Sequence, residues 1–273
     1  MPKLLNSWVL DFHQTGFAFP FAALSEDEVA YGHDVIMATQ GSQTAHLLSQ
    51  LDCPWTQKAY LLFPWLDQLI RHPAILDAVE VILGSDLLVL GGDLFIKQPR
   101  DPRFISWHQD ANYWQLEPLD VVTAWVAITE SAIANGCMRF SPGTHLTKLL
   151  HDETVSESNM LTRGQTIAAS IDESTTTCVE LKPGEFSLHH AQLAHASGAN
   201  RTDRVRIGFA IRYVSSQVKQ LAGPPISAML VRGCDRQHHF QLESRPSATL
   251  DPGAIAAHRR ALLPHKATRF STS

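Results

Sequence analysis

The 273-residue sequence lacks a large excess of charge of either sign, and it contains only four cysteines. Its 22 Lys and Arg residues against 27 Asp and Glu residues give a formal net charge of −5. A protein that binds nucleic acid or an anionic membrane normally carries a basic surplus, so we predict neither partner. The cysteines show no Cys-x-x-Cys spacing, which favours free thiols in a reducing compartment over a disulfide framework or a thiol metal site.

The sequence also lacks a long uninterrupted hydrophobic run. The short apolar run near the start is interrupted by Asn6 and Asp11, so it does not resemble a signal peptide. The most apolar stretch, residues 74–90, is interrupted by Asp77, Glu80 and Asp86 and is not a membrane-spanning segment. We therefore predict a cytoplasmic protein.

Hydrophobic residues make up 44% of the sequence and charged residues 18%, which predicts one globular domain over residues 1–273. Ser25 and Glu28 fit a capping box that begins a helix ending near Ala38. Apolar residues at spacings of three and four predict more helix in residues 44–50 and 64–81. Short β-type runs follow at 87–90, 94–97, 121–128, 177–181, 186–190 and 206–214.

A helical part at about 25–83 followed by a strand-rich part at about 87–240 predicts the α+β class, with a β-sandwich or barrel as its main body. The polar segment at about 146–176 lies between strand regions. We interpret it as a long loop with some helix and as a candidate lid.

A metal site is indicated by Trp107-His108-Gln109-Asp110. Two residues apart on a strand, His108 and Asp110 would point to the same face. A further histidine would complete the two-His-one-carboxylate set of non-haem iron(II) oxygenases. With 14 histidines, a single His-x-Asp arises by chance, so this pattern alone decides nothing.

Further motifs follow in order. They are Thr123-Ala-Trp125, Asn135-Gly-Cys-Met-Arg139, Pro142-Gly-Thr-His145, the segment from Leu181 through His195-Ala-Ser197 to Arg206, and Leu230-Val-Arg-Gly-Cys-Asp235. With these motifs, residues 94–240 resemble the phytanoyl-CoA dioxygenase (PhyH) family of iron(II)/2-oxoglutarate-dependent oxygenases. The resemblance implies a distorted double-stranded β-helix, a cupin-like jelly-roll, with N-terminal helices packed on one sheet and the metal between its two sheets.

The resemblance also implies roles for particular residues. His108, Asp110 and His195 match the family's metal ligands, and Arg206 matches the arginine that pairs with the distal carboxylate of 2-oxoglutarate. A guanidinium suits a carboxylate because its planar fork binds both oxygens and keeps its charge. Ser197, Trp125 and Lys97 match positions that line the co-substrate pocket, although Lys97 also fits a solvated strand edge.

Other residues carry alternatives. Asn112, Tyr113 and Trp114 follow the metal motif and would face the substrate or fill the core. His189 and His190 are competing ligands, but the spacing to Arg206 favours His195. His145 fits a structural turn, and Arg139 and Arg212 fit ion pairs or a substrate role.

The resemblance implies hydroxylation of an aliphatic carbon in a small metabolite, with Fe(II) as the metal cofactor, 2-oxoglutarate and O2 consumed, and succinate and CO2 released. Halogenating relatives have a small residue at the position of Asp110. The carboxylate of Asp110 therefore argues against halogenation. Residues 159–165 are similar to bacterial enzymes that act on aminoalkylphosphonates, so we expect such a zwitterion as substrate. The alternatives are an acyl-CoA hydroxylase, a catalytically silent jelly-roll that binds a metal or ligand, and a metal-dependent hydrolase. The sequence does not indicate the oligomeric state.

Overall fold

The computed structural model describes residues 7–153, 156–161 and 165–268, and it has the mixture of helices and strands expected for the α+β class. Contacts divide it into two compact units, which are described separately. Of the described residues, the first comprises those within 7–22, 95–114 and 122–208, and the second comprises those within 23–94, 115–121 and 209–268. Strands β2 (Leu87–Lys97) and β12 (Arg206–Ser215) contribute residues to both units.

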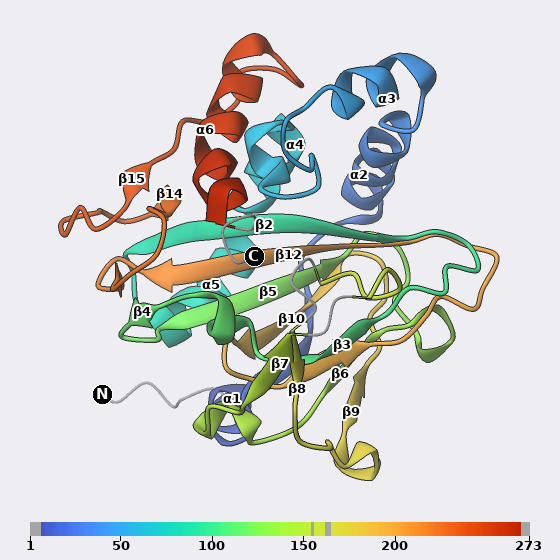
Figure 1. Ribbon diagram of the computed structural model, residues 1–273, viewed down its shortest axis with the longest axis vertical. Helices are drawn as coiled ribbons and strands as arrows, with labels where there is room; N and C mark the ends of the chain where they lie inside the picture. Colours follow the sequence, from blue (N-terminus) through green and yellow to red (C-terminus); the bar gives the residue numbers. More distant parts are fainter. Residues whose placement is uncertain (1–6, 154–155, 162–164, 269–273) are drawn as a thin grey trace. The chain divides into compact units, whose positions relative to one another are not determined.

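The first unit contains two layers of antiparallel strands (Figure 1). Its elements are α1 (Ser7–Thr15), β1 (Phe17–Ala22), β3 (Ile105–His108), β5 (Val121–Ala127), β6 (Met138–Phe140), β9 (Thr177–Val179), β10 (Glu185–His190) and β11 (His195–Ser197). In one layer β10 pairs with β1 and with β5, and the other has the order β3-β11-β6-β9. The ring centroid of Phe140 in β6 lies 5.1 Å from that of Phe17 in β1 and 5.1 Å from that of His189 in β10. Aromatic rings therefore fill the space between the layers.

The predicted strands at 121–128, 177–181, 186–190 and 206–214 are confirmed, with ends shifted by a few residues. The runs at 87–90 and 94–97, expected as two strands, form the single strand β2. A β-carbon on Gly92 would lie 2.7 Å from the Tyr60 ring and 2.8 Å from the Phe209 ring. The glycine therefore allows close packing inside a strand and does not mark a turn.

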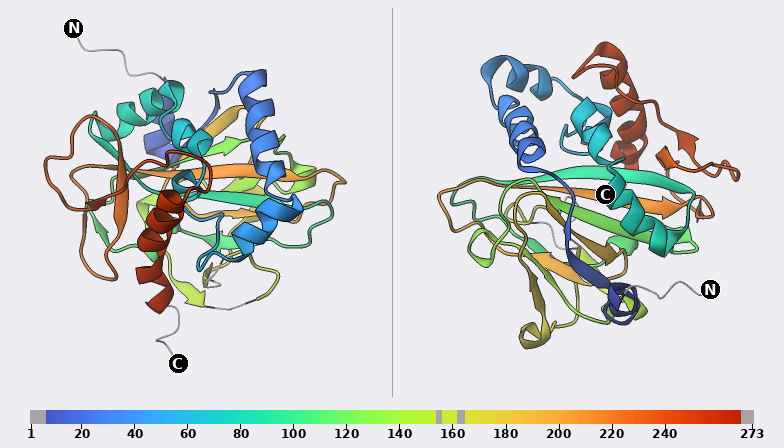
Figure 2. Two further views of the ribbon diagram at one scale, coloured as in Figure 1. Left: turned by 90° about the horizontal axis from the view of Figure 1, so that it is seen from above. Right: turned by 180° about the vertical axis from the view of Figure 1, so that it is seen from behind.

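The second unit places helices on one face of its strands (Figures 1 and 2). Its elements are α2 (Glu26–Ala38), α3 (Ser42–Ser49), α4 (Pro64–Leu69), α5 (Pro73–Leu83), α6 (Pro252–Thr268), β4 (Leu116–Glu117), β13 (Lys219–Gln220), β14 (Ser227–Arg232) and β15 (Gln241–Leu242). The capping box at Ser25 is present, as predicted. The stretch 64–81 contains two helices because Pro73, at the first turn of α5, cannot continue the helix before it. Tyr213 of β12 donates to the Ile70 carbonyl at the end of α4 and so ties that helix to the sheet.

The candidate lid at 146–176 contains strands where we expected a loop with some helix. Strand β7 (His151–Glu153) pairs with β8 (Gln165–Ile167), and the only helical piece among its described residues after Leu146 is the short 3-10 turn Glu173–Thr175. Residues 154–155 and 162–164 lie outside the described part. Ser106 of β3 donates through Oγ to the Gln165 carbonyl, so this segment lies against the strand that carries His108. Closure over the site stays a prediction.

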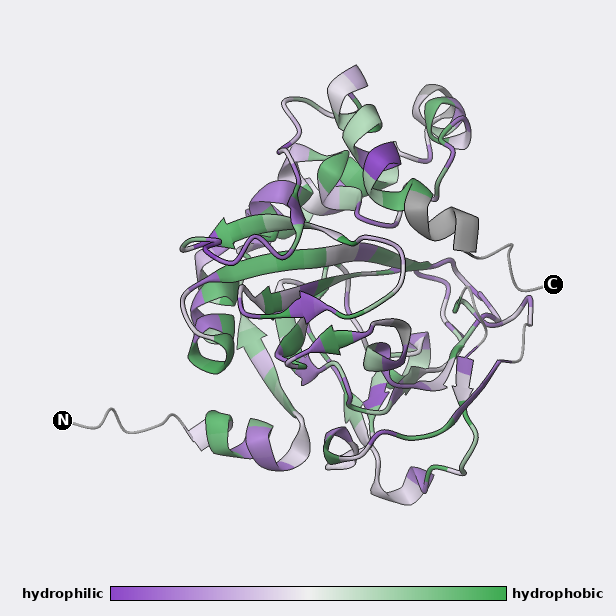
Figure 3. Ribbon diagram, turned by 60° about the vertical axis from the view of Figure 1, so that its left-hand side comes forward, coloured by the Kyte–Doolittle hydropathy of each residue, from purple (hydrophilic) through white to green (hydrophobic). Residues whose placement is uncertain are grey.

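Apolar residues concentrate in the long strands, which are mainly green in Figure 3. Val121 to Ala127 are buried without exception, as expected for a central strand covered on both faces. In the part of the chain that the structure describes, no helix has the length and apolar character needed to cross a membrane.

Candidate active site

Strands β3 and β11 bring two predicted ligands face to face. His108 and His195 are directly paired across the two antiparallel strands, and their ring centroids are 4.1 Å apart. Both side chains are buried, with 3% and 8% of the residue surface exposed. The strand pairing thus joins residues that are far apart in the sequence.

Asp110 completes the group, although not from a strand as we expected. Strand β3 ends at His108, and Asp110 begins the 3-10 turn Asp110–Tyr113. The intervening Gln109 has an extended backbone, with φ −114° and ψ 124°, so the side chains on either side of it still point the same way. Asp110 Oδ1 lies 3.4 Å from His108 Nε2.

The three side chains fit a divalent metal ion such as iron(II). One ligand atom from each of His108, Asp110 and His195 lies within 4.8 Å of the other two. The Nδ1 atoms of His108 and His195 each lie 2.9 Å from a backbone carbonyl oxygen, of Ser106 and Leu193. A carbonyl only accepts, so Nδ1 carries the proton and Nε2 keeps its lone pair for a metal.

Gln109 fixes the backbone between two of these residues. Its buried amide nitrogen donates to the Gln192 carbonyl at 2.6 Å and to the Thr147 carbonyl at 2.8 Å. Its amide oxygen accepts from the Leu149 N–H at 2.9 Å. These bonds hold the His108–Asp110 segment against the chain preceding His195 and against the start of the candidate lid.

Arg206 is a buried cation with unused donors. Only 1% of its surface is exposed, and its Nε and Nη1 have no hydrogen-bond partner among the described residues. Its guanidinium carbon lies 4.7 Å from the centroid of the Trp125 ring. Burial lowers the pKa of Arg206 to about 10, so the group stays charged at neutral pH. An anion such as a carboxylate would satisfy both the charge and the two N–H groups.

Lys97 lies in the same unit and is also buried. Its ammonium donates to Ser197 Oγ at 2.6 Å and to the Gly198 carbonyl. Lys97 has 0% of its surface exposed, so the alternative of a solvated strand edge is wrong. Burial first, and then the positive charge of Arg206, lower the pKa of Lys97 to about 7.

The residues considered for substrate follow Asp110 directly. Asn112 and Trp114 are half-buried, and the side chain of Tyr113 lies outside the described part of the structure. Their contact with substrate stays a prediction.

Of the other candidates, His189 lies with its ring 4.8 Å from the His195 ring, whereas His145, His190, Arg139 and Arg212 have separate surroundings. His190 accepts the Gln192 N–H at 3.0 Å and lies 5.6 Å from the His145 ring, and burial lowers the pKa of His190 to about 4. Arg139 pairs with Glu173 at 3.1 Å, and Arg212 pairs with Asp93 at 2.7 Å. These contacts agree with ion-pair roles for Arg139 and Arg212 and with structural roles for His145 and His190.

Two hydroxyls on the site-facing side of β5 and β10, those of Thr123 and Ser187, were given no site role from the sequence, although Thr123 stands in the motif Thr123-Ala-Trp125. Alternation along β5 places Thr123 on the same side as Trp125, and Ser187 is the direct strand partner of Trp125. Period-two alternation from Trp125 would have found both if the strand register had been known.

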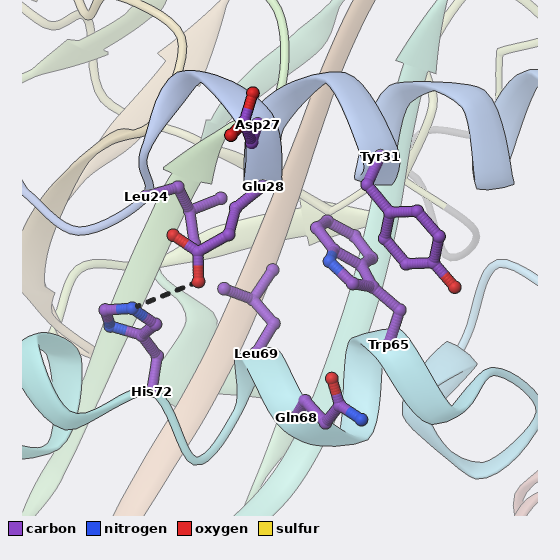
Figure 4. A pocket seen from close by; sticks show the side chains of 8 residues that line it. All are labelled: Leu24, Asp27, Glu28, Tyr31, Trp65, Gln68, Leu69 and His72. Carbon is purple, nitrogen blue, oxygen red and sulfur yellow. Dashed lines mark ion pairs between the residues drawn. The ribbon is translucent and has the colours of Figure 1, made fainter.

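A groove in the second unit is independent of this site. It lies between α2 and α4 and is shown in Figure 4, where a dashed line joins Glu28 and His72, 3.9 Å apart. Asp27, Tyr31 and Trp65 also line it. None of the predicted site residues lies there.

Comparison with known proteins points to one family. The model of the family "Phytanoyl-CoA dioxygenase (PhyH)" matches residues 12–208. A probable phytanoyl-CoA dioxygenase of Caenorhabditis elegans is 31% identical over an alignment of 163 positions that covers 57% of this chain and 52% of that protein. A probable alpha-ketoglutarate-dependent hypophosphite dioxygenase of Stutzerimonas stutzeri is 25% identical over an alignment of 187 positions that covers 67% of this chain and 63% of that protein. The chain thus spans less than two thirds of the length of each of these two relatives.

A solved structure is similar over almost the full length. The non-heme monooxygenase ThoJ, in its apo form, is 36% identical, with a TM-score of 0.79 over 94% of this chain and 95% of that chain. The similarity agrees with the α+β class and with the distorted double-stranded β-helix expected from the sequence.

Proposed function

Because this chain belongs to the phytanoyl-CoA dioxygenase family, we propose that it is an iron(II)- and 2-oxoglutarate-dependent dioxygenase that hydroxylates an aliphatic carbon of a small metabolite. The family is one of iron(II)/2-oxoglutarate oxygenases, and it is the family expected from the sequence. The proposal extends to a single catalytic domain over residues 1–273, a cytoplasmic location, and succinate and CO2 as co-products.

The observation that carries the proposal is the presence in one unit of a His-Asp-His group and a buried arginine with unused donors. When bound, iron(II) with 2-oxoglutarate and O2 supplies the oxidation of a C–H bond. The protein's own side chains hold the reactants. We assign the metal to His108, Asp110 and His195, and the co-substrate to Arg206 with Ser197, Trp125 and Lys97.

For the substrate we propose a small zwitterion such as an aminoalkylphosphonate. The relative from Stutzerimonas stutzeri is named for hypophosphite, a small phosphorus oxyanion. The segment 159–165, similar to phosphonate-acting enzymes, lies partly outside the described residues, but Asn159 donates to Ser106 Oγ of β3 at 2.9 Å. The backbone carbonyl of Ser106 also accepts the hydrogen bond from His108 Nδ1. Ser106 therefore connects this segment to a proposed metal ligand.

A second candidate is an acyl-CoA thioester, which the name of the Caenorhabditis elegans relative suggests. The two candidates separate in one assay. Purified protein loaded with Fe(II) is incubated with 2-oxoglutarate under air, with a panel of aminoalkylphosphonates, other zwitterions and acyl-CoA thioesters, and succinate is measured. The proposal predicts succinate that requires Fe(II), 2-oxoglutarate and O2 and rises with a zwitterion. If only acyl-CoA thioesters stimulate succinate formation, the substrate is an acyl-CoA thioester and not a zwitterion. If no compound gives succinate, the result favours a catalytically silent binding protein.

A further inference from the structure

Strands β5 and β10 present a row of four side chains on one face. In their antiparallel pairing Thr123 is opposite His189, and Trp125 is opposite Ser187. Directly opposite residues of an antiparallel pair lie on the same face, and so do residues two apart on one strand. The two hydroxyls, the indole and the imidazole therefore share a face.

The two ends of this face are fixed by contacts. At one end the His189 ring lies 4.8 Å from the ring of His195, a proposed metal ligand. At the other end the Trp125 ring lies 4.7 Å from the Arg206 guanidinium. The face thus extends from the metal residues to the buried arginine, which is the span that 2-oxoglutarate occupies if the proposed function is correct.

Both hydroxyls on this face are buried without a partner. Thr123 is 1% exposed and Ser187 is 0% exposed, and neither hydroxyl oxygen has a hydrogen-bond partner in the described parts of the chain. Buried polar groups of proteins are nearly always paired, and an unpaired one is costly. Nε and Nη1 of Arg206 are unpaired in the same unit. Four unused donors around one face match an acceptor-rich anion, whereas an apolar ligand would leave all four unsatisfied.

We propose that Thr123 and Ser187 are co-substrate-binding residues whose hydroxyls donate to oxygen atoms of 2-oxoglutarate lying between the metal residues and Arg206. This inference rests on the proposed function and gives a binding role to two hydroxyls to which the resemblance assigned none, that of Thr123 in the motif Thr123-Ala-Trp125 and that of Ser187. It makes recognition of the co-substrate depend on neutral donors of the sheet as well as on the buried cation.

The variants Thr123→Val and Ser187→Ala test the proposal. Binding of 2-oxoglutarate is measured by calorimetry on protein loaded with Mn(II), so that no turnover is needed. We expect each variant to bind about tenfold more weakly, equivalent to about 1.4 kcal/mol. The melting temperature of the metal-free protein should stay the same or rise, because an unpaired buried hydroxyl has been removed.

Ser131→Ala is the matched control. Ser131 is 1% exposed and its hydroxyl is also unpaired within the described residues, but it follows β5 in a bridge with Leu181 and not on this face. Its replacement should leave the affinity for 2-oxoglutarate unchanged. Thr123→Ser, which keeps the hydroxyl, should retain most of the affinity and separates loss of the donor from loss of packing.

Each result is decisive. If wild-type protein binds 2-oxoglutarate and both Thr123→Val and Ser187→Ala bind it equally well, the hydroxyls serve buried water and the proposal is overturned. The proposal is also overturned if each variant loses affinity for 2-oxoglutarate only to the extent that its melting temperature falls, because the loss then reflects a destabilised fold. It is likewise overturned if Thr123→Ser binds 2-oxoglutarate as weakly as Thr123→Val. If wild-type protein itself does not bind 2-oxoglutarate with metal present, it is the proposed function that fails.

Discussion

Gly208 of β12 lies so close to Trp125 of β5 that a β-carbon on the glycine would stand 1.8 Å from the indole ring. Only glycine therefore allows the indole to lie where it does, 4.7 Å from the Arg206 guanidinium. The position of Trp125, a proposed co-substrate residue, thus depends on the absence of a side chain two residues after Arg206.

Gly208→Ala should displace Trp125 and weaken 2-oxoglutarate binding by about tenfold, because crowding in a packed core shifts neighbouring side chains at a cost of roughly 1–3 kcal/mol. Gly91→Ala is the control, since its β-carbon would make only an ordinary contact, 3.6 Å from Arg212 Nη1. The half-saturation concentration of 2-oxoglutarate and the melting temperature should be measured for both. Equal behaviour of the two variants would contradict the role given to Gly208.

His195→Ala and His108→Ala should lose iron(II) binding at micromolar metal while keeping the fold, because three protein ligands leave no spare donor. Metal content after dialysis and a far-ultraviolet circular dichroism spectrum measure the two effects. His190→Ala, which changes β10 of the other layer, should retain the metal. If instead His195→Ala keeps its iron and His190→Ala loses it, the ligand assignment is wrong.

Asp110→Ala should lose hydroxylation by a factor of about 100 or more, whereas Asp110→Glu should keep weak metal binding with displaced geometry. Removing the carboxylate also opens a metal position, so a halide could enter there. Succinate and product are assayed together, with and without chloride. Undiminished hydroxylation by Asp110→Ala would exclude a His-Asp-His metal site.

Lys97 should make the stability of the metal-free protein depend on pH. Its pKa in the folded protein is about 7, below its ordinary value of 10.5. Below pH 7 both the folded and the unfolded state bind the proton, so the full cost of burying the charge is present. Between pH 7 and 10.5 the unfolded state binds more protons, and the free energy of unfolding therefore rises with pH.

From pH 7 to pH 9 wild-type protein should gain up to about 2 kcal/mol of stability that Lys97→Met does not gain. Urea unfolding at several pH values provides the comparison. A difference between the two proteins that stays constant with pH would mean that Lys97 keeps its proton throughout this range.

The sequence could predict those features of the fold that depend only on residues close together in the chain. The capping box at Ser25 and the apolar run of β5 are local signals, and both are present in the structure. The pairing of His108 with His195 needed the family resemblance, because no spacing indicates which strands become neighbours.

Other features could not be predicted because their cause lies far away in the chain. Gly92 continues a strand because it packs against Tyr60 and Phe209, which the local sequence does not reveal. Asp110 leaves the strand but keeps its direction because Gln109 is held extended by bonds to Thr147, Leu149 and Gln192. The unpaired hydroxyls of Thr123 and Ser187 become recognisable only when burial and strand register are known together.

The most direct test of the site is an anaerobic titration of 2-oxoglutarate into iron(II)-loaded protein, comparing wild type with Arg206→Ala and Arg206→Lys. We predict saturable binding by wild type that requires the metal, and an affinity about 30-fold lower in Arg206→Ala, as a loss of about 2 kcal/mol implies. Arg206→Lys should recover only part of it, because an ammonium cannot reproduce the guanidinium fork. Iron content should be the same in all three proteins. An unchanged affinity in folded, iron-loaded Arg206→Ala, or binding by wild type that does not need the metal, would contradict the assignment of this site to iron(II) and 2-oxoglutarate.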